Sequence, residues 1–163
     1  IFAPQLLQNF AFSDCLVSSQ TMHNLLLLSV NVIAEVTIPV GTAIIEYIAN
    51  YEEYKKLQPQ SSVTKEHFEL YWDRESAVLK AINDGGVRLM RKLEFLEGVK
   101  IRLPFKNSIY IIELSKSEVE KFLGFNFKEI RSDWDNTFSN KYVYTKEGRK
   151  EFFEKFGRIE NKK

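Results

Sequence analysis

Residues 99–114 read VKIRLPFKNSIYIIEL, two apolar runs separated by the dipeptide Lys106-Asn107. In the first run Lys100 and Arg102 alternate with apolar residues, which is typical of a strand with one face in solvent. A two-residue break between two such runs indicates a tight reversal of the chain. This stretch therefore predicts an antiparallel hairpin with strands at 99–105 and 108–114.

The segment just before this hairpin predicts a helix and a further strand. Apolar residues at three- and four-residue steps predict a helix from Thr64 to Ile82, and the run NDGG at 83–86 is expected to end it, because glycine and asparagine tolerate positive φ. Residues 87–96 are expected to form a strand, with Glu97-Gly98 as the turn into the hairpin.

Nearer the start of the chain, residues 30–40 alternate between β-branched and polar side chains and predict a strand. From Thr42 the apolar period changes to three and four residues, which predicts a helix to about Leu57. The polar run QPQSSV at 58–63 then interrupts the chain. We expect one domain, residues 1–163, with a sub-boundary at 58–63 between an apolar front, 1–57, and a charge-rich back, 64–163.

Downstream of the hairpin, Ser115 to Leu123 predicts a short helix ended by Gly124, and 126–134 predicts a second helix or an irregular segment. Residues 141–145 are expected to be a strand and 146–156 a terminal helix. The predicted fold class is α+β: an N-terminal apolar strand and helix region, two amphipathic helices, then an antiparallel β-meander with short C-terminal helices.

The charges are distributed unevenly along the chain. All 23 basic side chains and 17 of the 22 acids follow residue 54, and the first base is Lys55. The back of the chain therefore carries a positive surplus, together with most of the 22 aromatic side chains. Such a surplus attracts polyanions, whereas the aromatic rings serve either as core anchors, the more common role, or as platforms for bases.

Composition excludes several other classes. One cysteine, Cys15, excludes an internal disulfide, and with two histidines it is too few for a zinc site, so no metal and no cofactor are expected. Residues 25–49 are apolar over the length of a membrane helix. Glu35 and Pro39 within them favour an ordinary core, and no membrane span is expected. The expected site of action is cytoplasmic.

His67, Tyr71 and Arg74 are candidate catalytic residues. On a continuous helix they would share one face, at steps of four and three residues. Histidine can move a proton, arginine can stabilise developing phosphate charge, and tyrosine can hold a base, as a metal-independent ribonuclease requires. Small secreted ribonuclease toxins share this order of helices and strands. The alternative is a structural role, with Tyr71 in the apolar stripe.

Five basic residues are candidate nucleic-acid contacts: Lys100, Arg102 and Lys106 on one sheet face, and Lys128 and Arg131 on the second short helix. The segment 115–134 resembles a helix-turn-helix, with Gly124 at its turn, and 142–149 resembles the strand of winged variants. That resemblance implies DNA binding. The alternative is two short helices packed on the core, because acids accompany the bases of the second helix.

Two further interpretations remain open. Glu113 and Lys116, with Glu97 upstream, loosely resemble the Glu-x-Lys element of metal-dependent nucleases, although here the spacing is Glu-x-x-Lys and strand-end polarity explains it equally. The apolar residues 1–49 could instead dock on a protein partner or form a homodimer. Taken together, the sequence favours a protein that acts on nucleic acid, RNA ahead of DNA, with a DNA-binding domain and a protein-interaction module as alternatives.

Overall fold

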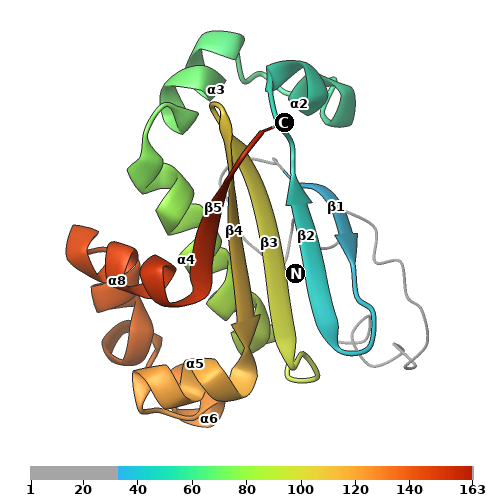
Figure 1. Cartoon of the computed structure of the whole chain (residues 1–163). Coiled ribbons are helices and arrows are strands. Elements are labelled where there is room, and N and C mark those ends of the chain that lie inside the picture. Colours follow the sequence, from blue (N-terminus) through green and yellow to red (C-terminus); the bar gives the residue numbers. More distant parts are fainter. Residues whose placement is uncertain (1–32, 163) are drawn as a thin grey trace.

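The computed structural model describes residues 33–162, which form one five-stranded sheet with helices packed on one face (Figure 1). The strands are β1 (Ile33–Thr37), β2 (Thr42–Tyr47), β3 (Gly98–Phe105), β4 (Ser108–Ser115) and β5 (Gly157–Asn161). The helical elements are α2 (Tyr51–Leu57), α3 (Lys65–Trp72), α4 (Glu75–Lys92), α5 (Lys116–Leu123), α6 (Phe127–Ser132), the π-helical turn η2 (Asp135–Ser139), α7 (Asn140–Tyr142) and α8 (Lys146–Phe156). The predicted α+β class is confirmed.

The strands lie in the sheet in their chain order, but not all of them are antiparallel. The predicted β3–β4 hairpin is confirmed, and β5 continues it antiparallel to β4. In contrast, β2 runs parallel to β3, with Ala43 opposite Val99 and Ile45 opposite Ile101. The sheet is therefore mixed, because α2, α3 and α4 carry the chain back across it between the two parallel strands.

The expected helix from Thr42 to Leu57 is wrong over its first half. Thr42–Tyr47 is β2, and α2 begins at Tyr51, where the Asn50 side chain accepts a hydrogen bond from the backbone N–H of Glu53. Apolar residues occur on both faces of β2, so their spacing along the sequence resembled the three- and four-residue spacing of a helix. The predicted strand at 30–40 is confirmed for Ile33–Thr37, and residues 30–32 lie outside the described part.

The expected stop at residues 83–86 and the expected strand at 87–96 are both wrong. Helix α4 runs through the glycines without a break, and residues 93–97 join it to β3, which begins at Gly98. The pair marks the place where the helix lies closest to the sheet: a β-carbon built on Gly86 would lie 2.5 Å from a methyl group of Leu114. The break comes earlier, at Arg74, whose backbone is extended.

Downstream of β4 most expectations are confirmed. Helix α5 ends at Gly124, with φ of 76°, and Asn126 and Glu129 form a capping box on α6. The expected strand at 141–145 is wrong, because these residues include a helical turn, α7. Strand β5 was not predicted, since Ile159 is its one apolar residue and its strand pairing is with β4.

The core lies between the sheet and the helices. Alternate residues of β3 and β4 face α4 and are buried, among them Val99, Ile101 and Ile112. A second part of the core is aromatic and joins the C-terminal helices, with Phe152 in contact with the rings of Phe122, Phe138, Tyr142 and Phe156. Among residues 33–162, no helix has the length and apolar character needed to cross a membrane.

Candidate functional site

A pocket of about 260 Å³ opens at the carboxyl ends of β2 and β3. Because these two strands are parallel, both end at the same edge of the sheet, and this is where open α/β sheets commonly hold ligands. The residues just after β2 form one wall, α3 forms another, and the β3–β4 hairpin closes the third side. The pairing of β2 with β3 thus creates the concavity.

Four aromatic side chains line this pocket: Tyr51, Phe68, Trp72 and Phe105. Tyr51 donates a hydrogen bond to the carbonyl of Val63 at 3.0 Å, and its ring lies 5.8 Å from that of Phe68. The indole nitrogen of Trp72 is shielded from solvent and has no hydrogen-bond partner in the described part of the chain. A buried N–H donor of this kind gains when an acceptor reaches it.

Three charged side chains line the pocket: Glu69, Asp73 and Lys106. Asp73 forms an ion pair with Lys106 at 3.2 Å, and Glu69 lies 3.8 Å from Lys65. All four of these side chains are largely exposed, so water screens the pairs. The lining is therefore largely aromatic, with one acid in excess at its rim, and its four rings suit a flat ring as the ligand.

The predicted catalytic residues lie at this end of the molecule but do not form a single face. His67 and Tyr71 are exposed on α3, one turn apart, as expected. Arg74, also exposed, lies beyond the end of α3 at the start of α4, so the expected continuous helix is wrong there. His67 does not line the pocket. Lys106 forms an ion pair with Asp73 and so lies near Arg74, the next residue along the chain.

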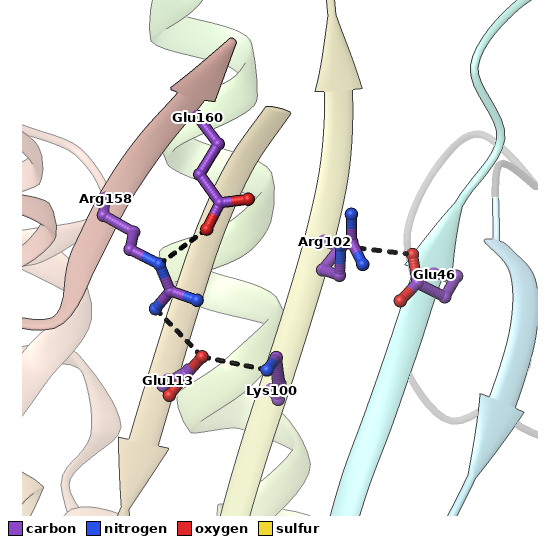
Figure 2. A network of polar contacts seen from close by, with 6 residues as sticks. All are labelled: Glu46, Lys100, Arg102, Glu113, Arg158 and Glu160. Atoms are coloured by element: carbon purple, nitrogen blue, oxygen red, sulfur yellow. Dashed lines mark hydrogen bonds and ion pairs between the residues drawn. The ribbon is translucent and has the colours of Figure 1, made fainter. Parts of the chain in front are cut away.

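Lys100 and Arg102 lie on the face of the sheet opposite α4, within a network of charges (Figure 2). Lys100 lies 3.0 Å from Glu113, and Arg102 lies 3.8 Å from Glu46. Arg158 extends the network by contacting Glu113 at 2.9 Å and Glu160 at 3.0 Å. The two predicted contacts therefore lie on one face, but carboxylates from β2, β4 and β5 offset its positive charge.

The pKa values of the carboxyls in this network reflect their surroundings. Hydrogen bonds from Lys100, and then from Arg158, hold the pKa of Glu113 below its ordinary value. Partial burial raises the pKa of Glu46, although the Arg102 guanidinium acts in the other direction. The network thus favours the ionised form of Glu113, whereas the burial of Glu46 disfavours its ionised form.

Lys128 and Arg131 lie far from the pocket, because α6 is at the opposite end of the sheet from α3 (Figure 1). The two helices predicted for 115–134 are confirmed, and Val119, Phe127 and Ile130 bury them against the core. Lys128 is exposed, whereas Arg131 lies 3.4 Å from Glu94. The structure therefore separates these two bases from Lys106 by the length of the sheet.

The sequence interpretation missed an arginine cluster beside α6. The guanidinium carbons of Arg88 and Arg91 lie 5.2 and 4.8 Å from the centre of the Trp134 ring, and Arg91 donates a hydrogen bond to the carbonyl of Arg131. The three-residue spacing of these arginines signals a shared helix face. The signal was lost because residues 87–96 were expected to form a strand. The bidentate pair of Arg88 with Asp84 offsets part of the charge.

The nuclease-like residues of the β4 end have separate partners. Lys116 lies 3.4 Å from Glu97 and donates to the carbonyl of Glu94, whereas Glu113 belongs to the network of Figure 2. No cluster of three metal-ligating side chains occurs within 33–162. The predicted docking surface, residues 1–49, lies largely outside the described residues.

Compared with protein-family models, with curated proteins and with solved structures, the chain matches none of them significantly. The site itself is therefore the guide to function. Its aromatic residues were expected to be core, since each belongs to an apolar stretch of its own. No local signal joins Tyr51, Phe68 and Phe105; only the pairing of β2 with β3 brings them together.

Proposed function

We propose that the protein binds single-stranded nucleic acid, RNA ahead of DNA, by taking one base into the aromatic pocket. The observation that carries this proposal is the set of four aromatic side chains around one concavity of about 260 Å³. Bases of single strands stack on such rings, and each stacked base contributes about 1–3 kcal/mol. The Trp72 indole N–H offers a donor to a base carbonyl.

The polar side chains at the rim support RNA over DNA. Glu69 and Asp73 line the pocket and can accept a hydrogen bond from a ribose 2′-hydroxyl, which DNA lacks. Lys106 and Arg74 lie at the same end and would contact the phosphates on either side of the bound base. Many lysine and arginine side chains elsewhere on the protein are paired with carboxylates. We therefore expect the affinity for RNA to depend only weakly on salt concentration.

Tryptophan fluorescence tests this proposal directly. The sequence has two tryptophans, and Trp134 lies beside α4 and α6, so Trp134→Phe leaves Trp72 as the single reporter. We expect a single-stranded RNA oligonucleotide to change the emission of this variant, and the matching DNA to do so less strongly. In an anisotropy assay Trp72→Ala should weaken RNA binding roughly tenfold to a hundredfold, as loss of one stacked base implies.

Two variants serve as controls for this test. Trp134→Phe and Lys128→Ala, both at the other end of the sheet, should bind RNA as the wild type does. Equal RNA affinity of Trp72→Ala and the wild type would contradict the proposal, as would an absence of binding to any single strand. Circular dichroism of Trp72→Ala establishes that a loss of binding does not come from unfolding.

A second candidate function is cleavage of the bound RNA. The observation that favours it is the exposure of His67 and Tyr71 one turn apart on α3, with Arg74 just beyond. His67 would act as acid or base, Arg74 would stabilise the phosphate charge, and Tyr71 would hold a base. His67→Ala should abolish cleavage and leave binding unchanged; cleavage retained in that variant excludes this mechanism.

A further inference from the structure

Strand β5 leaves one side of its backbone unpaired. It pairs with β4 from Ser108 opposite Asn161 to Ile112 opposite Gly157, and across residues 33–162 no strand adjoins its other side. Its side chains are mostly exposed, and Ile159 is 50% accessible. An edge strand of this kind can pair with a further strand through its free N–H and C=O groups.

The strand at the other edge of the sheet, β1, pairs irregularly with its neighbour, whereas β5 pairs regularly. The register of β1 against β2 shifts between Ile33 and Glu35, and such bulges make an edge a poor template for pairing. The register of β5 against β4 is continuous over all five residues. Edges are also commonly protected by side chains of like charge, but β5 carries one charge of each sign.

These two charges are self-complementary. Arg158 and Glu160 flank Ile159, and both lie on the face of the sheet opposite α4 (Figure 2). In an antiparallel pair of two β5 strands centred on Ile159, Arg158 of each copy lies opposite Glu160 of the other, on the same face. Opposite charges directly across two strands stabilise the pair, and the symmetric register provides two such contacts.

We propose that β5 is a self-association edge, at which two copies of this chain pair antiparallel about a two-fold axis through Ile159. The contact joins the two sheets and continues the charge network of Figure 2 from one copy into the next. Arg158 uses its Nε for Glu160 and Nη1 for Glu113, which leaves Nη2 for Glu160 of the second copy. The two Ile159 side chains cover one another on the helix side, next to Tyr110.

The extent of this contact determines its strength. Five residues from each copy bury less surface than a stable dimer interface does, so the dimer forms only at high protein concentration. This surface is separate from the nucleic-acid pocket, which lies at the carboxyl ends of β2 and β3. Self-association through β5 therefore does not depend on the proposed function.

Sedimentation equilibrium of the full chain over a range of concentrations tests the proposal. We expect a monomer–dimer equilibrium for the wild type. Glu160→Arg puts two pairs of arginines opposite each other and should weaken the dimer roughly tenfold or more. Arg158→Glu puts two pairs of glutamates there and should do the same. An equimolar mixture of these two variants restores both opposite-charge pairs, so the mixture should dimerise although neither variant does alone.

Each result decides the question. A wild type that stays monomeric at its highest soluble concentration overturns the proposal. A dimer that Glu160→Arg leaves as strong as the wild type also overturns it and assigns association to another surface. Failure of the mixed variants to associate overturns the antiparallel register about Ile159. Circular dichroism of each variant checks the fold, which both exposed positions are expected to preserve.

Discussion

Val40 occupies a backbone conformation that its side chain disfavours. It has φ of 45°, Gly41 follows with φ of 76°, and the backbone N–H of Thr42 donates to the carbonyl of Pro39 at 3.0 Å. These values describe a tight two-residue turn between β1 and β2 that favours Asn-Gly. A β-branched residue is strained there, and full exposure of Val40 provides no compensating contact.

Val40→Asn should therefore raise the free energy of unfolding by about 1 kcal/mol. Urea denaturation followed by circular dichroism measures the change. Val40→Ile is the matched control, because it keeps the branched β-carbon, and it should give no gain. Equal stabilities of the asparagine and isoleucine variants would mean that the turn is not strained.

Helix α4 offers a matched pair of glycines. A β-carbon on Gly85 would meet its nearest neighbours at 3.8 Å, an ordinary contact, whereas one on Gly86 would lie 2.5 Å from Leu114. Gly85→Ala should raise stability by about 0.5–1 kcal/mol, since alanine favours the helix. Gly86→Ala should lower it by about 1–2 kcal/mol, because buried Leu114 must move. Thermal unfolding of both variants distinguishes them, and a gain at Gly86 would contradict the close packing.

Helix α4 also illustrates which helices and strands could be predicted from the sequence and which could not. Elements with local signals were predicted well, such as the β3–β4 hairpin with its two-residue turn and α5 with Gly124 at its end. In α4 the glycine pair favours a helix stop by its local signal, but Ile82, Leu89 and Met90 continue one buried stripe through it. The glycines are tolerated because the helix packs closely on the sheet there and only small residues fit. This packing arises from tertiary structure and has no local signal in the sequence.

The charge network of Figure 2 joins side chains from four of the described strands, β2 to β5. The pKa of Glu113 is lower in the folded chain because Lys100 and Arg158 donate hydrogen bonds to it. Such a carboxyl contributes stability above its unfolded pKa, about 4.3, and the contribution is lost as the pH falls through the folded value. Since the side chain is 45% exposed, screening limits the contribution to under about 1 kcal/mol.

Glu113→Gln should therefore be less stable than the wild type near neutral pH, and the difference should shrink as the pH falls below about 4. Urea unfolding at a series of pH values measures it. Glu66→Gln, an exposed change on α3 outside this network, is the control. A constant difference between Glu113→Gln and the wild type at all pH values would show that ionisation of Glu113 does not stabilise the sheet.

Across the molecule, the sequence predicted where basic side chains lie but not which acids pair with them. Of the three bases expected on one face, Lys100 and Arg102 lie there, whereas Lys106 lies in the β3–β4 turn beside Asp73. The acids that offset Lys100 and Arg102, Glu113 and Glu46, come from neighbouring strands. Likewise, the pocket needs residues from three separate segments, which no local pattern connects. Burial and turns leave local traces in a sequence, whereas complementarity between distant segments becomes visible only in the folded chain.

The parallel pairing of β2 with β3 has a consequence for the order of assembly. Thr42 lies opposite Gly98 and Glu46 opposite Arg102, so the two strands meet only across the whole α2–α4 crossover. Contacts between such distant residues form late, because closing a long loop costs entropy before any pairing rewards it. On the ribosome, β2 emerges long before β3 is synthesised, so the backbone N–H and C=O groups of β2 that later pair with β3 stay unpaired by it in the nascent chain.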